Sequence, residues 1–326
     1  MLLFSDAAFL LLVALLLDAL IGDPPWLWRH VPHPVALIGK VIEIADQDFN
    51  APEASETNRR IYGAIFLACL VAISVLVGIL LEAILRALPF GEIGIAVIAA
   101  VFIAQKSLHD HVAAVRDGLV EGGLSGGRRA VAMIVGRDPK QLDEAGVARA
   151  AIESCAENAA DGVTAPALWF LLFGLPGLIA YKAVNTADSM IGHKTDRHRA
   201  FGWASARFDD LVNWPAARLC GLAMAVTAPL SGRSVTECIA VMRRDAPKHR
   251  SPNAGWPEAA MAAVLGLALA GPRAYPGYTV DDPFMNEDGR REATAGDISR
   301  ALKVFRHAMA LQAGAVALLA LLMLFL

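Results

Sequence analysis

Apolar stretches alternate with polar segments along the whole chain. Residues 61–81 hold no charged side chain over 21 positions, and residues 308–326 hold none over 19. A helix needs about 20 apolar residues to cross the hydrocarbon core of a bilayer. The pattern therefore predicts an integral membrane protein. Its transmembrane helices are expected near residues 5–21, 61–85, 93–105 and 308–326.

Three more apolar stretches have two interpretations, and they lie at residues 162–181, 212–230 and 259–272. Gly174, Pro176 and Gly177 interrupt the first of them, and the pieces on either side are too short to cross a bilayer. It is either a re-entrant hairpin or one kinked helix, since Gly and Pro are frequent in membrane helices. We expect one all-α, membrane-embedded domain over 1–326, a polytopic helical bundle with re-entrant or broken helices and cytoplasmic helical loops.

Composition and charge support a membrane protein and argue against nucleic-acid binding. Charged residues make up 19% of the chain, against about 25% in soluble domains. The net charge of -3 leaves no positive surplus for nucleic acid. Lys and Arg occur in every polar segment, and the positive-inside rule places such segments in the cytoplasm. The four cysteines are scattered without the spacing of metal ligands, so we interpret them as small, reduced, apolar residues.

The segment 149–161 carries three carboxylates and one arginine at intervals of four residues. Arg149, Glu153, Glu157 and Asp161 share one face of a predicted helix, with Asn158 beside them. A solvated helix with i,i+4 ion pairs would show the same spacing. The opposite face is mostly alanine, however, which indicates close packing in a bundle. Carboxylates packed near a membrane tend to be functional, and these are suited to hold Mg²⁺ together with phosphate oxygens.

A second polar group follows the apolar stretch 162–181. Lys182, Asn185 and Asp188 are three residues apart and share a helical side. His193 and Lys194 follow at the predicted helix end, with donors that suit a phosphate group. A capped helix end and a lysine that reaches toward the membrane interface are the structural alternatives.

A third group contains a pair of aspartates, Asp209 and Asp210, followed by Asn213. Arg207 and Arg218 flank them and are suited to bidentate binding of phosphate or carboxylate. An acidic helix N-terminus is the structural alternative. Paired aspartates at a membrane mouth also resemble the metal sites of intramembrane prenyltransferases, which gives an alternative function.

Six spaced strings resemble the membrane-bound amide synthases of cobalamin biosynthesis, the adenosylcobinamide-phosphate synthase family. They are D-x-x-x-G-D-P at 18–24, HPV at 33–35, RAAIESCAENAADGV at 149–163, YKAVNTADSMIGHKT at 181–195, FGWASARFDDLVN at 201–213 and SPNAGWPEAAM at 251–261. The similarity covers nearly the whole chain in order, and six matches of this length are specific together.

The resemblance implies that the free carboxylate of (adenosyl)cobyric acid is joined to the amine of aminopropanol or its phosphate. The product is (adenosyl)cobinamide or its phosphate, with ATP and Mg²⁺ as expected cosubstrates and the corrinoid as substrate. It also implies a bacterial inner-membrane protein with its site facing the cytoplasm. Expected partners are these small molecules, the lipid bilayer, and a second copy of the chain or other cobalamin-pathway enzymes, with no nucleic acid.

The same resemblance assigns hypothetical roles to the three polar groups. Catalytic roles fall to Glu153, Glu157 and Asp188. Substrate binding falls to Arg149, Asn158, Lys182, Asn185, His193, Lys194, Arg207 and Asn253, the last in the turn-rich segment 251–258. Metal binding falls to Asp161, Asp188, Asp209 and Asp210. The alternatives are a Mg²⁺-dependent prenyltransferase-like enzyme and a transporter that uses broken helices around 174–177.

Overall fold

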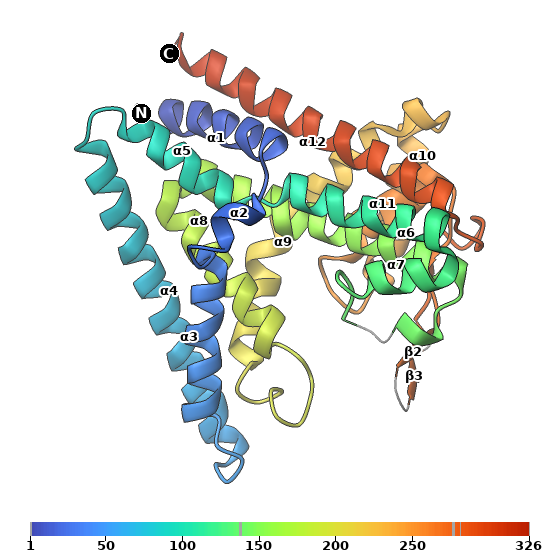
Figure 1. The fold of residues 1–326 in the computed structure, drawn as a ribbon, viewed down its shortest axis with the longest axis horizontal. Helices are drawn as coiled ribbons and strands as arrows, with labels where there is room; N and C mark the ends of the chain where they lie inside the picture. Colours follow the sequence, from blue (N-terminus) through green and yellow to red (C-terminus); the bar gives the residue numbers. More distant parts are fainter. Residues whose placement is uncertain (1, 137–138, 276–277, 281, 326) are drawn as a thin grey trace. The chain divides into compact units, whose positions relative to one another are not determined.

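The computed structural model describes residues 2–136, 139–275, 278–280 and 282–325. Most of this chain is helical, as Figure 1 shows. It divides into two compact units, which we describe separately. The first unit holds Met1–Ala104, Ala165–Asn213 and Val316–Leu326, and the second holds Gln105–Thr164 and Trp214–Ala315. The prediction of an all-α membrane fold is confirmed, whereas the single domain stays a prediction.

The first unit is built from long helices with well-defined starts. They are α1 (Leu2–Leu20), α2 (Pro25–Trp28), α3 (Pro34–Phe49), α4 (Glu56–Arg86), α5 (Gly91–Phe102), α8 (Ala165–Ile191) and the first part of α9 (Trp203–Val226). The side chain of His33 caps α3 by accepting the backbone N–H of Val35. Ser55 caps α4 by accepting the N–H of Asn58. Such caps satisfy donors that a helix start leaves without partners.

The core of the first unit lies between α3, α4 and α8. Ile42, Leu70, Ala187 and Phe201 are buried there together. Helix α4 packs more extensively against α8 than against any other described element. Gly78 permits this approach, because a Cβ at that position would overlap the backbone of Pro176 on α8. Hydrophobic burial of this kind supplies most of the stability of a packed helix.

Helix α8 is not straight, because it kinks sharply at Gly174. This residue has φ +64° and ψ −151°, a conformation that favours glycine. A Cβ on Gly177 would lie 2.5 Å from the carbonyl oxygen of Trp169, eight residues earlier. In a straight helix, eight residues span about 12 Å. The carboxylate of Glu82 on α4 accepts the N–H of Leu175, at the start of the second arm (3.1 Å). That the segment 162–181 is re-entrant in a bilayer stays a prediction.

The second unit consists of shorter helices and a few strands. Its helices are α6 (Gln105–Val131), α7 (Glu144–Ala159), α10 (Val235–Asp245), α11 (Gly255–Leu265) and most of α12 (Ala295–Met323). Short 3₁₀ turns lie at Pro139–Gln141, Ala228–Ser231 and Ala246–Lys248, and a π-helical turn lies at Ala160–Thr164. Strands β1 (Leu269–Ala270) and β4 (Phe284–Met285) pair antiparallel, as do β2 (Arg273–Tyr275) and β3 (Tyr278–Val280).

The apolar stretch 259–272 forms part of the core of the second unit. Helix α11 supplies its first residues and has only 11 residues, or about 17 Å of helix. Every residue from Pro257 to Leu265 is buried within the protein. A short helix buried on all sides is typical of a core element. Helix α11 is also too short to cross the hydrocarbon region of a bilayer, which is about 30 Å thick.

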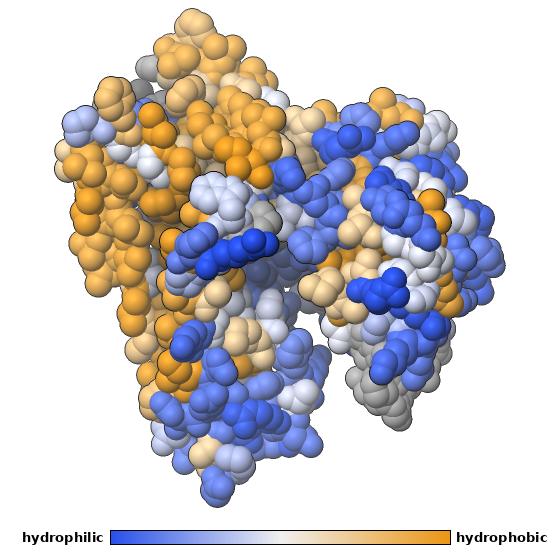
Figure 2. Space-filling view, viewed as in Figure 1, coloured by the Kyte–Doolittle hydropathy of each residue, from blue (hydrophilic) through white to orange (hydrophobic). Residues whose placement is uncertain are grey.

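Four helical stretches of the described chain are long and apolar enough to cross a membrane. They are Glu56–Arg86, Gly91–Val131, Glu144–Ile191 and Ala295–Met323. Figure 2 shows the outer face of α4 covered by hydrophobic residues over most of its length. Hydrophilic residues gather at the N-terminal end of α4, where the turn between α3 and α4 lies. This distribution is the one expected of a membrane-embedded helix with one end in water.

Candidate functional site

The first unit brings the second and third predicted groups together across α8 and α9. Asn185 on α8 donates a hydrogen bond to Asp209 Oδ1 on α9 (3.3 Å). Asn213, one turn after Asp209, donates to its Oδ2 (2.9 Å). The hydroxyl of Tyr181 donates to Asn213 Oδ1 (2.8 Å). Residues four apart share a helix face, so the two helices present a continuous polar surface to each other.

Two further carboxylates lie close enough to influence Asp209, and we call Asp188, Asp209 and Asp210 the acidic cluster. Burial, then repulsion from Asp188, raises the pKa of Asp209 to about 7, although the amides of Asn213 and Asn185 oppose the change. Burial also raises the pKa of Asp210, opposed by the positive charges of Arg207 and Lys194. The cluster therefore concentrates negative charge in a poorly hydrated place.

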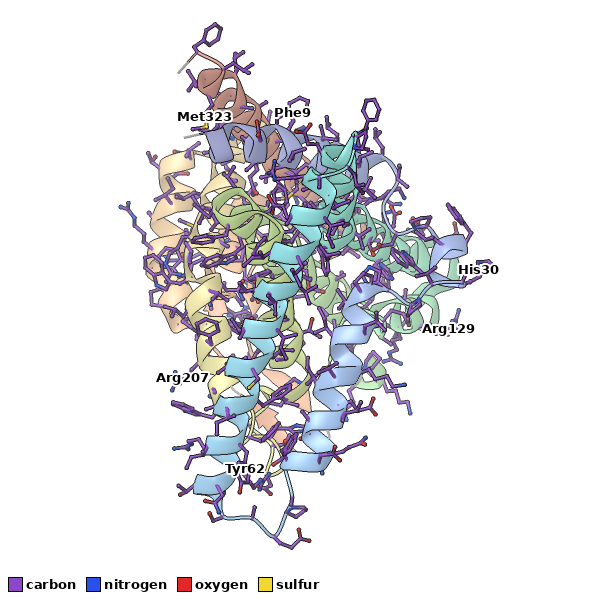
Figure 3. All side chains as sticks on the ribbon, turned by 90° about the vertical axis from the view of Figure 1, so that its left-hand side faces the viewer. Phe9, His30, Tyr62, Arg129, Arg207 and Met323 are labelled. Carbon is purple, nitrogen blue, oxygen red and sulfur yellow. The ribbon has the colours of Figure 1, made fainter. Side chains whose placement is uncertain are left out.

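Three cationic residues lie beside this cluster, and we call them its rim. His193 interacts electrostatically with Asp188, and Lys194 and Arg207 interact with Asp210. All three side chains are exposed. In Figure 3, Arg207 on α9 and Tyr62 on α4 lie toward the same end of the first unit, opposite Phe9 on α1. That is the end of the unit where hydrophilic residues gather, so the rim is accessible to water.

The loop 192–202 is fixed at this end by a network of buried and half-buried polar groups. Arg59 on α4 donates to Asn50 (2.6 Å) and to the carbonyl of Arg197. The guanidinium of Arg197 forms an ion pair with Asp46 on α3 (2.7 Å). Burial would raise the pKa of Asp46, but hydrogen bonds from Asn50 and Arg197 hold it below its usual value. This network positions the chain that follows His193 and Lys194.

The first predicted group belongs to the second unit, on α7. The carboxylate of Glu153 is buried and accepts the backbone N–H of Ala270 in β1 (2.8 Å). Glu157 and Asn158 are exposed, and the amide of Asn158 donates to the carbonyl of Ser154 (2.9 Å). Glu153 thus has a structural contact, while Glu157 and Asn158 face away from the core. The roles assigned to all three stay predictions.

Arg149 and Asp161, the other two members of the first predicted group, are half-buried. Asp161 lies in the π-helical turn that follows α7. Such turns are frequent at functional sites. Neither residue belongs to the same unit as the acidic cluster.

Asn253 is buried in the second unit beside a stacked arginine. The guanidinium of Arg218 lies over the rings of Trp214 (4.0 Å) and Trp256 (4.5 Å). Its Nη1 donates to Asn253 Oδ1 (3.4 Å). A guanidinium between two indoles is held in a fixed position by cation–π attraction.

Lys182, the remaining predicted residue, belongs to the first unit, where it is half-buried on α8, one residue after Tyr181.

Tyr181 is a part of the site that the spacing argument did not single out. It is buried, and its hydroxyl holds Asn213, which in turn holds Asp209. A signal was present in the sequence, because Tyr181 precedes Asn185 by four residues and therefore shares its helix face. The pattern did not show that Asn213 would lie opposite.

The donors present fit Mg²⁺ bound together with phosphate oxygens. No group of three or more His, Cys, Asp or Glu side chains able to hold a metal ion occurs among the described residues. Mg²⁺ commonly takes only one or two carboxylates and completes its shell with water and phosphate. Asp188 and Asp209 repel each other, so a cation between them would relieve an unfavourable interaction. These two residues are the ones that would hold it.

The fold and the site define an all-α membrane protein with an acidic, cation-rimmed site at the hydrophilic end of its apolar helices. A family model described as CobD/Cbib protein matches residues 11–305. The chain belongs to the CobD/Cbib protein family, which confirms the resemblance found in its sequence. This membership supports a role in cobalamin biosynthesis and disfavours a prenyltransferase or a transporter.

Known relatives match the chain over nearly its full length. A protein from Sinorhizobium sp. is 51% identical over 316 residues, covering 96% of this chain and 98% of its own. One from Brucella suis biovar 1 is 52% identical over 307 residues, covering 93% and 94%. One from Rhodobacter capsulatus is 46% identical over 306 residues, covering 93% and 94%. Each of these relatives is named Cobalamin biosynthesis protein CobD. No solved structure matches the chain.

Proposed function

We propose that the protein condenses the free carboxylate of (adenosyl)cobyric acid with the amine of aminopropanol or aminopropanol phosphate. An amide forms, and ATP supplies the phosphoryl group that carries away the carboxylate oxygen as phosphate. The observation that supports the proposal most is the acidic cluster with its rim of cations, in a chain of the CobD/Cbib family. The ATP requirement itself comes from the family resemblance.

The chemistry needs a cation-rich rim and a proton acceptor. A carboxylate reacts with an amine only after its oxygen becomes a good leaving group, so phosphate groups must be bound and their charge balanced. His193, Lys194 and Arg207 are exposed at the rim and are suited to this task. Mg²⁺ held by Asp188 and Asp209 would supply further positive charge at the phosphate oxygens.

The attacking amine must lose a proton as the amide forms, and a carboxylate within reach can accept it. Asp210 is the half-buried member of the acidic cluster and lies beside Arg207 and Lys194. We assign it this role. Asn185 and Asn213 hold Asp209 in position through their amide donors. Tyr181 holds Asn213 in turn, so one chain of hydrogen bonds from Tyr181 keeps Asp209 in place.

We further propose that the site faces the cytoplasm across the bacterial inner membrane. Arg59, Arg60, Arg197 and Arg199 gather at the hydrophilic end of the first unit, close to the rim residues in sequence or by contact. Basic residues next to membrane helices are enriched on the cytoplasmic side. ATP and phosphorylated small molecules are available there.

The test is condensation by the purified full-length protein in detergent. Adenosylcobyric acid, aminopropanol phosphate or aminopropanol, ATP and Mg²⁺ are supplied, and the product is detected by mass spectrometry. The wild-type protein is expected to give the amide-condensed mass, and Asp188→Asn is expected to lose it while keeping its melting temperature. Asp48→Asn is the matched control, because it removes an exposed carboxylate from α3 of the same unit.

Absence of product from folded wild-type protein with both amines would contradict the proposal as stated. A repeat in a membrane extract from cells that express the protein separates two explanations. Product in the extract alone shows that a further protein is required. Full activity of Asp188→Asn would remove the acidic cluster from the reaction.

A further inference from the structure

A small pocket of about 200 Å³ lies beside the first turns of α12, inside the second unit. One wall is formed by the segment after α9, which contributes Leu230 and Ser231. The other wall is α12, which contributes Arg300, Lys303 and His307. None of these residues belongs to the candidate functional site.

The pocket is strongly basic. Arg300, Lys303 and His307 are three and four residues apart, so their side chains share one face of α12. No acidic side chain is among the described residues that line it. Arg300 is paired with Asp297 on the same helix, so the local attraction for anions comes mainly from Lys303 and His307.

The three basic groups differ in how far they are already engaged. The guanidinium of Arg300 donates to Asp297 Oδ1 (2.8 Å) and to the carbonyl of Leu265 (2.6 Å), so it is held in place. Lys303 and His307 are exposed and make no hydrogen bond or ion pair within the described part of the chain. They are therefore available to a ligand, with the hydroxyl of Ser231 nearby.

The position of the pocket along α12 indicates which kind of anion would bind there. The uncharged part of α12 begins at Ala308, directly after His307. In Figure 2 the surface changes from hydrophilic to hydrophobic along this helix toward its C-terminal end. Leu230 and Val304 add apolar surface to the pocket. A basic pocket at the end of an apolar helix is the place where membrane proteins meet phosphate groups at the bilayer surface.

We propose that this pocket binds the phosphate group of a phosphate ester, through Lys303, His307 and Ser231. The ester is either an anionic phospholipid or a small phosphorylated molecule from the aqueous phase. Ammonium, imidazole and hydroxyl groups all donate hydrogen bonds to phosphate oxygens. The apolar wall formed by Leu230 and Val304 contacts the organic part of the ester.

Two binding measurements on the full-length protein separate the sources. In the first, inorganic phosphate and glycerol phosphate are titrated into the detergent-solubilised protein by calorimetry. In the second, the protein is placed in nanodiscs of phosphatidylcholine with or without phosphatidylglycerol, and the retained lipid is identified by native mass spectrometry. Binding in the first measurement indicates a soluble ester. Retention of phosphatidylglycerol without binding of the soluble phosphates indicates a lipid head group.

A pair of variants on α12 tests the pocket itself. Lys303→Gln removes one positive charge from the pocket, and we expect about a tenfold loss of affinity or retention, the usual effect of losing one charge-assisted hydrogen bond. Arg306→Gln removes one positive charge from an exposed position on the same helix outside the pocket lining, and we expect a change of less than about twofold.

Three results would overturn the proposal. The first is no binding in either measurement. The second is an equal loss in both variants, which would show attraction to a diffuse basic surface. The third is full binding by Lys303→Gln. Melting temperatures of both variants are compared with that of the wild type, and no loss is expected because both side chains are exposed.

Discussion

Two buried carboxylates, one in each unit, have opposite surroundings. Asp209 in the first unit is 7% exposed and receives hydrogen bonds only from neutral amides among its described contacts, those of Asn185 and Asn213. Its nearest charged influence is another carboxylate, Asp188. Asp245 in the second unit is fully buried, with 0% exposure.

Asp245 is surrounded by positive charge and a backbone donor. Arg244 and Lys248 each form an ion pair with it at 2.8 Å, and the N–H of Asn286 donates to it at 2.8 Å. Burial would raise the pKa of Asp245, but hydrogen bonds from Arg244, Lys248 and Asn286 lower it to about 2. The charged form is therefore the stable form in the fold.

The comparison separates a structural carboxylate from one that is prepared for a ligand. Both groups are removed from water, which disfavours a charge. At Asp245 the protein supplies the compensation itself, and the group ties the end of α10 to Asn286, which follows β4. At Asp209 the described surroundings leave compensation to something else, and a cation with bound phosphate is what we propose. Burial alone would not have distinguished the two groups.

The largest expected effect is on catalysis by Asp209→Asn. We expect condensation to fall by at least about 100-fold, because one of the two carboxylates proposed to hold Mg²⁺ is lost and such a metal stabilises the transition state by several kcal/mol. Thermal stability at pH 8 is expected to stay the same or rise, because the substitution removes a charge that burial and Asp188 disfavour. Condensation is measured by mass spectrometry and unfolding by scanning fluorimetry. A large loss of stability would instead make Asp209 a structural group like Asp245.

The reverse result is expected at Asp245. Asp245→Asn leaves Arg244 and Lys248 without their charged partner, and we expect a loss of about 2 kcal/mol in unfolding free energy, typical for hydrogen bonds to a charged group. The activity of the molecules that remain folded is expected to stay near the wild-type value. Thermal unfolding of the detergent-solubilised protein is the measurement. An unchanged melting temperature would contradict the structural role.

The pH dependence of stability gives a further test of Asp245, because protonation of this carboxylate is linked to unfolding. The pKa of Asp245 is lower in the folded protein than its ordinary value of 3.8, so its charged form stabilises the fold. This contribution is complete above about pH 4 and is lost as the pH falls toward 2, up to about 2 kcal/mol. Melting temperatures between pH 5 and pH 2 should fall less steeply in Asp245→Asn than in the wild type. Equal slopes would show that Asp245 is not responsible.

The smallest effect is expected where an ion pair is exposed. Arg199 pairs with Glu56, and both side chains are more than half exposed. Water screens such a pair, so Arg199→Gln should change the unfolding free energy by less than about 0.5 kcal/mol. A loss as large as that of Asp245→Asn would show that the loop 192–202 depends on this contact. Scanning fluorimetry of the two variants side by side decides between these results.

The sequence predicted the helices better than their paths. The uncharged runs at 61–81 and 308–326 lie within α4 and α12, since length and apolar character suffice to define such helices. Gly174, Pro176 and Gly177 marked the break in α8. The same marks fit a re-entrant hairpin or one kinked helix, and only the structure gives the contacts at the kink, with Trp169 and with Glu82, which is far away in the sequence.

The candidate site was predictable in its members and not in its arrangement. Spacing placed Asn185 with Asp188, and Asp209 with Asn213, on single helix faces. It also placed Glu153 with Glu157, yet the structure buries Glu153 against Ala270 and exposes Glu157. Helical periodicity defines a face, while the neighbours of that face come from distant parts of the chain.

The sequence by itself determined that this protein is helical, lies in a membrane and belongs to a cobalamin-biosynthesis family. Those properties follow from local composition and from strings of residues, which exist before the chain folds. Only the tertiary structure decided which carboxylates are compensated. Burial and then Asp188 raise the pKa of Asp209 to about 7, whereas hydrogen bonds from Arg244, Lys248 and Asn286 lower the pKa of Asp245 to about 2. Electrostatic interactions depend on distance and burial in the folded chain, and those are properties of the packing of helices against one another.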